Sequence, residues 1–255
     1  MYLLFFGGKI RYTRRNDMKY TENYKVKWHD TDATRCVKPS EILVYMQETA
    51  NLQLKSADNT LDKMRDEQGL AFILSKIKLI FHAQLHAYDE ISVRTWTCDS
   101  RGYTFLRCFD IHRGEELIAE GISFWALVDL NTRRFVRADG FSLGVESDEP
   151  LAIDVPRRIK PSSPETEILG TREIRYSDID YNMHMNNTKY PNMLCDFMPI
   201  EKIGSIREMT LEFLHESALG DTLTFHGCNA DGRYYFKTLN TAGDTCLTAE
   251  VLVAE

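Results

Sequence analysis

The chain has 255 residues, of which 43% are hydrophobic and 27% charged, and its formal net charge is −7. This length allows one large domain or two domains of ordinary size with a substantial core, and the composition is neither that of a disordered chain nor that of a membrane-embedded one. No apolar run approaches the roughly 20 residues that span a bilayer, and the net acidity argues against a general nucleic-acid binder. We therefore expect no membrane and no nucleic-acid partner.

The cysteines and the first residues indicate a cytoplasmic protein. The six cysteines form no C-x-x-C pair and are too sparse for a disulfide scaffold, which predicts reduced thiols. Residues 1–18 place their apolar residues before their charges and are too short for a signal peptide. We interpret them as an N-terminal extension outside the fold, with either Met1 or Met18 as the true start.

Residues 19–138 read as a strand, a helix and then an antiparallel meander. Alternation from Thr21 predicts the first strand, and Ser40 is placed to cap a helix whose apolar residues keep helical spacing as far as Leu54. A polar passage, residues 58–69, follows this helix. Strand-like patterns then cover residues 71–82, 90–98, 103–111 and 117–128, separated by turn residues.

The rest of the chain repeats this order after a linker. Residues 139–166 contain several prolines and acidic residues, as a linker does. In residues 167–255 we expect a strand at 168–176, a helix at 187–203, and strands at 206–215, 222–228, 234–239 and 245–253.

The two halves also align in sequence, which predicts a duplication. The segments that begin at Leu74 and Ile206 align without a gap at an offset of 132, and Asp30 and Asp32 match Asp178 and Asp180 at an offset of 148. The difference between the offsets gives the first copy 16 extra residues around its helix. Each copy has one helix and a sheet with a single apolar face, so the simplest burial wraps the sheet around the helix, and two such sheets can join edge to edge. We therefore predict an α+β double hotdog fold, with a linker that crosses the molecule.

The stretch Tyr176–Tyr190 holds the densest group of polar side chains. Its alternation is typical of a strand or an extended loop, which would point the alternate residues the same way. The other interpretation is an Asx-rich turn that caps a helix starting near Asn187. The alternating residues are Asp178, Asp180, Asn182, His184 and Asn186.

Only the second copy keeps this polar row. The first copy has other residue types at the aligned positions. Thr34 aligns with Asn182, Cys36 with His184 and Lys38 with Asn186. The neutral Gln84 aligns with Glu216. The contrast predicts one working site per chain, in the second copy. We expect the first copy to provide the wall or pocket for the apolar part of a substrate.

These residues resemble a known family. The run Asp178–Tyr190, followed by M-T-L-E-F-L-H-E from Met209, resembles the signature of the acyl-ACP thioesterases of plants and bacteria, and the likeness extends from about Lys19 to the C-terminus. The resemblance implies a double hotdog that hydrolyses fatty acyl-ACP to free fatty acid and holo-ACP, with no cofactor and no metal. The partner would be acyl carrier protein bearing a fatty acyl phosphopantetheine. The catalytic set that it implies is Asp180, Asn182, His184 and Glu216.

One position departs from the family. An older view of these enzymes used a papain-like cysteine directly after the glutamate, where this chain has Ser217. A serine is a nucleophile only with a base in reach, so this departure favours mechanisms in which the carboxylates and the histidine act. Glu216 and His184 would activate water, Asn182 would orient the water or the carbonyl, and amides near Asn187 could bind the oxyanion. In the rival mechanism, Asp180 or Glu216 is a covalent nucleophile.

Other functions remain open at this point. A related hotdog enzyme could hydrolyse acyl-CoA, or hydrate or dehydrate an acyl chain, and a non-enzymatic protein could only bind acyl thioesters. A homodimer is possible. Two exposed basic groups are candidates for docking an acidic carrier protein, namely Arg157, Arg158 and Lys160, and Arg133, Arg134 and Arg137.

Overall fold

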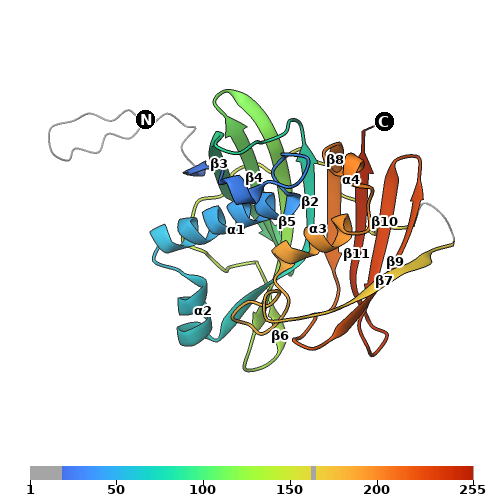
Figure 1. The fold of residues 1–255 in the computed structure, drawn as a ribbon. Helices are drawn as coiled ribbons and strands as arrows, with labels where there is room; N and C mark the ends of the chain where they lie inside the picture. Colours follow the sequence, from blue (N-terminus) through green and yellow to red (C-terminus); the bar gives the residue numbers. More distant parts are fainter. Residues whose placement is uncertain (1–18, 162–164, 255) are drawn as a thin grey trace.

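The alternating apolar runs form a large antiparallel sheet, with the helices on its inner side (Figure 1). The computed structural model describes residues 19–161 and 165–254, so the predicted N-terminal extension lies outside the described residues. The strands are β1 (Tyr20–Lys25), β2 (Leu70–Phe81), β3 (Glu90–Arg101), β4 (Thr104–Arg113), β5 (Glu116–Asp129), β6 (Arg134–Val136), β7 (Glu167–Glu173), β8 (Ile206–Phe213), β9 (Thr222–Ala230), β10 (Arg233–Leu239) and β11 (Thr245–Val253).

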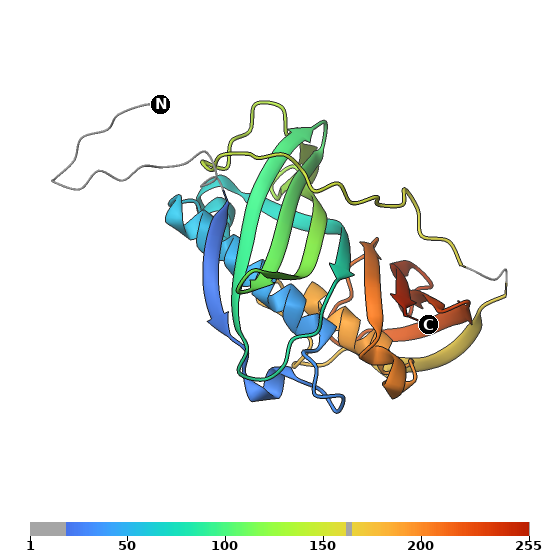
Figure 2. The same ribbon diagram turned by 90° about the horizontal axis from the view of Figure 1, so that it is seen from above.

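The long helix of the first repeat begins where proline favours it. Pro39 occupies its first position, where the missing N–H costs nothing, so Ser40 lies inside the first turn rather than capping it as predicted. The helix lies across the inner face of the first-repeat strands (Figure 2). The helical segments are α1 (Pro39–Ser56), α2 (Leu61–Gln68), α3 (Tyr190–Cys195) and α4 (Ile200–Ile203), with short 3-10 turns η1 (Trp28–Asp30) and η2 (Asn187–Lys189).

The strand order of the sheet reflects the duplication. The order is β1-β3-β4-β5-β2-β8-β11-β10-β9-β7, so the two repeats meet at the β2–β8 pair and mirror each other outward. In that pair Lys78 lies opposite Thr210, and their numbers differ by 132, the offset of the two copies in the sequence. Lys78 and Thr210 are therefore repeat counterparts that face each other, which places a pseudo-twofold axis between them. The predicted edge-to-edge joining and the double hotdog are confirmed.

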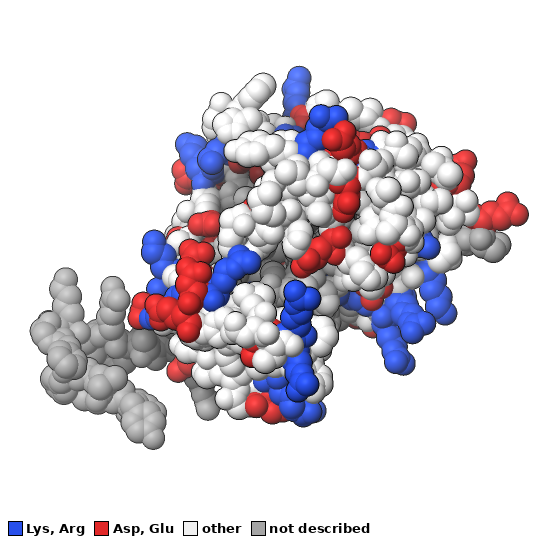
Figure 3. Space-filling view, turned by 90° about the horizontal axis from the view of Figure 1, so that it is seen from below, with Lys and Arg blue, Asp and Glu red and all other residues white. Residues whose placement is uncertain are grey.

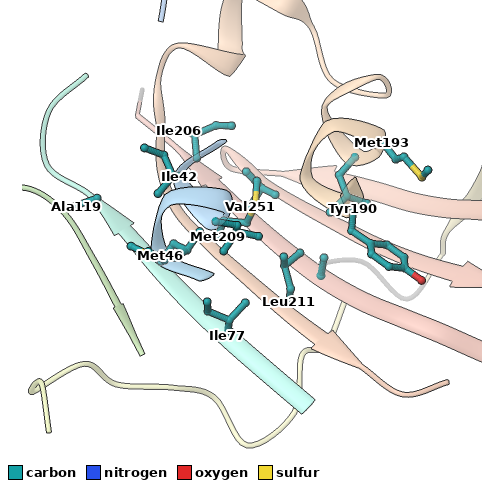
Figure 4. Packing of buried hydrophobic residues seen from close by; sticks show 14 of the residues in the cluster. Ile42, Met46, Ile77, Ala119, Tyr190, Met193, Ile206, Met209, Leu211 and Val251 are labelled. Carbon is teal, nitrogen blue, oxygen red and sulfur yellow. The ribbon is translucent and has the colours of Figure 1, made fainter. Parts of the chain in front are cut away.

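One apolar core serves both repeats. Ile42 and Met46 of α1 pack near Ile206 and Met209 of β8, and Tyr190 of α3 belongs to the same cluster (Figure 4). Met46 and Met209 are almost completely buried. Each such side chain contributes about 1.5–3 kcal/mol relative to exposure, so burial of these residues stabilises the junction between the repeats.

The predicted linker crosses the outer face of the first sheet (Figure 2). Its described residues 139–161 contain no helix or strand, and Leu151, Ile153 and Val155 pack on a cluster around Trp96. The Lys76 ammonium donates to the carbonyls of Pro156 and Arg157 at 2.9 and 3.0 Å. The exact limits of the extension, the repeats and the linker stay a prediction.

Two predicted elements differ from the structure. The helix expected at 187–203 is broken into η2, α3 and α4, because Pro199 has no N–H to continue an α-helix and its ring clashes with the preceding turn. The polar passage 58–69 is not a loop but contains α2, capped by Thr60 and ended by Gly69 in the left-handed conformation. Among the described residues, no helix is long and apolar enough to cross a membrane.

Candidate active site

The Asp178–Asn186 stretch is a compact turn, and the expected extended row is wrong. The Asp180 N–H donates to the His184 carbonyl at 3.0 Å, and Met183 has a positive φ of 66°. Asp178 is buried and accepts from Arg172 at 2.7 Å, while Asn186 accepts from the Thr188 N–H at 2.9 Å. The alternate residues therefore point different ways, because Asx side chains satisfy their own backbone here.

Three of the four residues in the predicted catalytic set lie on this turn, and the fourth, Glu216, contacts it. The Asp180 carboxylate accepts the Asn182 N–H at 2.8 Å, which fixes the tip of the turn. An isolated antiparallel bridge joins His184 to Ala218, next to Glu216. His184 Nδ1 lies 3.2 Å from Glu216 Oε2, with both side chains partly exposed.

The contact with Glu216 favours one tautomer of the His184 ring. Nδ1 is the ring nitrogen beside the carboxylate, and an ionised carboxylate can only accept a hydrogen, so a neutral His184 is favoured with its proton on Nδ1. In that tautomer Nε2 carries the free lone pair. A histidine held by a carboxylate in this way can take a proton from a nucleophile.

The first repeat has the same turn without the same chemistry. The Asp32 N–H donates to the Cys36 carbonyl at 2.9 Å, and Arg35 has a φ of 68°. Cys36 Sγ lies 2.8 Å from Gln84 Oε1, at the place that His184 and Glu216 occupy in the second repeat. The duplicated backbone is kept, and the ionisable pair is present in one copy.

A pocket lies beside this first-repeat turn. Its lining includes Asp32, Cys36 and Gln84 together with Gly204 and Arg207 of the second repeat. The Gln84 side-chain amide donates to the Gly204 carbonyl and links the two repeats there. This pocket is the counterpart of the catalytic position, not the position of His184.

Ser217 does not face His184 in the way a nucleophile would. Its side chain is 1% exposed and its Oγ lies 2.8 Å from the Tyr190 hydroxyl. Burial raises the pKa of Tyr190 and also that of the nearby Cys246 thiol, so both stay protonated near neutral pH. This supports the prediction that the histidine and the carboxylates carry the chemistry.

One contact at the site was missed from the sequence. Arg65 of α2 donates from Nη1 to Asn182 Oδ1 at 2.5 Å, and its guanidinium lies 5.2 Å from the centre of the Tyr181 ring. Arg65 belongs to the first repeat and Asn182 to the second. The signals for α2 were its Thr60 cap and Gly69, but only Met64 is buried along it, so no apolar period marks the helix.

The amides at the start of the predicted helix are largely used within the turn. The Thr188 N–H is bonded to the Asn186 side chain, and the Lys189 N–H donates to the Asn186 carbonyl at 2.9 Å. The proposed oxyanion role for these amides is therefore weakened. In residues 19–161 and 165–254, no three His, Cys, Asp or Glu side chains cluster to hold a metal ion.

Two protein-family models match the chain. The model of the acyl-ACP thioesterase N-terminal domain matches residues 17–140, and that of the C-terminal domain matches residues 162–247. The chain belongs to the acyl-ACP thioesterase family. The two matches divide the chain as its duplication does, and the C-terminal one contains the His184 turn and Glu216.

Individual relatives are distant in sequence. A chloroplastic palmitoyl-acyl carrier protein thioesterase of Arabidopsis thaliana is 24% identical over 90% of this chain. The match covers 59% of that relative, so this chain spans little more than half of its length.

Solved structures show the same fold. An acyl-ACP thioesterase from Bacteroides thetaiotaomicron superposes with a TM-score of 0.86 at 22% identity, covering 95% of this chain and all of that one. A 12:0-ACP thioesterase from Umbellularia californica gives a TM-score of 0.76 at 17% identity, covering 95% of this chain and 99% of that one. Both likenesses support the double hotdog.

Proposed function

We propose that this protein hydrolyses fatty acyl-ACP to free fatty acid and holo-ACP, and so ends fatty acid synthesis. The observation that carries the proposal is the His184–Glu216 pair, 3.2 Å apart in the repeat that keeps the family signature. The neutral Cys36–Gln84 pair at the matching place supports a single active site. Family membership supports the substrate class.

The proposed reaction needs a base and a stabiliser of negative charge. Glu216 holds the Nδ1–H of His184, and Nε2 takes a proton from water as that water attacks the thioester carbonyl. The carbon–sulfur bond of the tetrahedral intermediate then breaks, and the phosphopantetheine thiolate leaves with little help, since its parent thiol has a pKa of about 8–9.

Asp180 has a supporting role in this scheme. Its carboxylate accepts the Asn182 N–H and closes the turn that carries the site. The rival mechanism, in which Asp180 or Glu216 attacks covalently, would form an acyl-enzyme anhydride. Rapid-quench single-turnover reactions with a radiolabelled acyl group distinguish the two, because only the anhydride route leaves the acyl group covalently bound to the enzyme after holo-ACP has been released.

The acyl chain is proposed to lie against the first repeat. The support is that α2 of this repeat touches the catalytic turn through Arg65, so the two repeats meet at the site. The interior between α1 and the first sheet is apolar along Ile42 and Met46. An acyl chain that reached this interior would have to displace packed side chains, because Ile42 and Met46 are both buried.

An acidic carrier protein would dock on local basic groups. On the face seen in Figure 3, Lys and Arg side chains form separate groups interleaved with acidic ones. Arg157, Arg158 and Lys160 line one open surface pocket, and all three are exposed. We propose this group as a docking site; action in the cytoplasm and homodimer formation stay predictions.

The function is tested by incubating the purified chain with a panel of acyl-ACPs and the matching acyl-CoAs, and measuring free fatty acid by chain length. The proposal expects fatty acid release from ACP thioesters at a higher kcat/KM than from CoA thioesters. Preference for CoA would favour the acyl-CoA alternative. Conversion of a 3-hydroxyacyl or 2-enoyl substrate without thiol release would favour a hydratase or dehydratase.

A further inference from the structure

The contact between Arg65 and Asn182 fixes which end of the Asn182 side-chain amide is left free. A guanidinium has N–H donors and no acceptor, so the atom that it meets at 2.5 Å is the carbonyl oxygen Oδ1 and not the NH₂ group. The NH₂ group must point the other way. Within the described residues no acceptor is bonded to it, so it is available to a ligand.

We infer that Arg65 is a positioning residue for hydrolysis: it holds Asn182 so that the side-chain NH₂ donates to the thioester carbonyl. Asn182 then binds the carbonyl oxygen and the oxyanion that forms on it, rather than accepting a proton from water. This inference rests on the proposed function and deepens it. It also supplies a donor beside a helix start where the Thr188 and Lys189 amides are already bonded to Asn186.

Arg65 is itself well held. Its charge lies over the ring of Tyr181, the neighbour of Asn182, so the guanidinium contacts the tip of the turn twice. Its helix is anchored by Met64, which is 1% exposed. A donor held this firmly prevents the Asn182 amide from turning over, which would present an oxygen to the developing oxyanion.

The placement of Arg65 explains the asymmetry of the repeats. Helix α2 lies in the region where the first copy is 16 residues longer than the second. The extra residues therefore carry a side chain from the first repeat to the active site of the second. The working site is assembled from both repeats.

The test is a double-mutant cycle with Arg65→Met and Asn182→Ala. Removal of an oxyanion donor costs about 100-fold or more in kcat, and we expect that loss for Asn182→Ala. We expect a loss of about 10-fold for Arg65→Met, because the freed amide spends part of its time turned over. The double variant should be no slower than Asn182→Ala alone, since Arg65 acts through Asn182.

Three controls separate positioning from folding and docking. Arg65→Lys, which keeps one donor, should recover part of the loss. Lys63→Met, on the same helix and paired only with Asp58 at the surface, should be unaffected. The Arg65→Met loss should be the same on an acyl-N-acetylcysteamine thioester as on acyl-ACP, because the small substrate has no carrier protein to dock.

Losses that multiply in the double variant would overturn the inference, as would a loss confined to KM for acyl-ACP. If the wild-type protein is active and Arg65→Met is fully active as well, the inference about Arg65 is overturned while the proposed function stands. If the wild-type chain released no fatty acid from any acyl thioester, the proposed function would fail instead.

Discussion

His184 and Asn182 each lie against a partner that can play only one part in a hydrogen bond. Glu216 can only accept, which leaves Nε2 of His184 free, and Arg65 can only donate, which leaves the NH₂ of Asn182 free. The site thus presents one base and one donor. Those are the two groups that thioester hydrolysis requires.

At this scale the sequence singled out the residues that the turn and the Glu216 contact bring together, but not the directions of their side chains; their catalytic role stays a prediction. The D-x-N-x-H pattern marked Asp180, Asn182 and His184, and the repeat contrast added Glu216. The alternation was misleading because these side chains make local hydrogen bonds. Asp178 accepts from Arg172, and Asn186 accepts from the Thr188 N–H. Consecutive turns of this kind place Asx residues at every second position, as a strand does. No sequence rule indicates that a residue 117 positions away will orient Asn182.

Ser217→Ala tests whether the buried hydroxyl takes part in the reaction. We expect kcat within about threefold of wild type, while the free energy of unfolding falls by about 1–2 kcal/mol, because the buried Tyr190 hydroxyl loses its partner. Urea denaturation and steady-state kinetics on acyl-ACP measure the two effects. Adding Tyr190→Phe should recover part of the stability, and a hundredfold loss of kcat at unchanged stability would identify Ser217 as the nucleophile.

Helix α2 is the element that the apolar pattern could not reveal. Tertiary contacts through Met64 and Arg65 hold it, while the other side chains, apart from Leu61, are polar and largely exposed. The broken helix of the second repeat is the opposite case, since apolar spacing continued past Pro199 although the backbone could not. The strands were predicted well because the sheet buries one face along each of them.

Thr60→Ala tests whether the order of α2 matters to the site. Thr60 accepts the Lys63 N–H at 3.2 Å, and loss of such a cap costs about 1 kcal/mol. We expect faster amide hydrogen exchange in residues 61–68 and a kcat lowered a few-fold through Arg65. Thr60→Ser keeps the capping oxygen and should behave as wild type. If Thr60→Ala exchanges faster without any change in kcat, the order of α2 does not affect the reaction.

At the scale of the whole molecule, the duplication was predictable because its offsets are visible in the sequence. The Lys78–Thr210 pairing shows that the offset of 132 is also the symmetry of the sheet. Ion pairs of Lys76 with Glu212 and Lys78 with Glu208 cross the same junction at 3.0 and 2.8 Å. The route of the linker over the outer face depends on Trp96 and these lysines, which its composition did not indicate.

The shared core predicts that the two repeats unfold together. All three tryptophans, Trp28, Trp96 and Trp125, belong to the first repeat, so their fluorescence reports on that half, while far-UV circular dichroism reports on both. We expect coincident urea transitions by the two probes. A circular dichroism transition that persists after the fluorescence change would show that the second repeat is stable by itself.

The claim on which the account depends is that the thioester is hydrolysed at the site in the second repeat, through His184, and not at its counterpart in the first repeat. The direct measurement is kcat for acyl-ACP in His184→Ala and in its repeat counterpart Cys36→Ala, with both folds checked by circular dichroism. We predict a loss of about 10²–10⁴-fold for His184→Ala and a change of less than about threefold for Cys36→Ala. Near-normal turnover by His184→Ala, or an equal loss in both variants, would contradict the account.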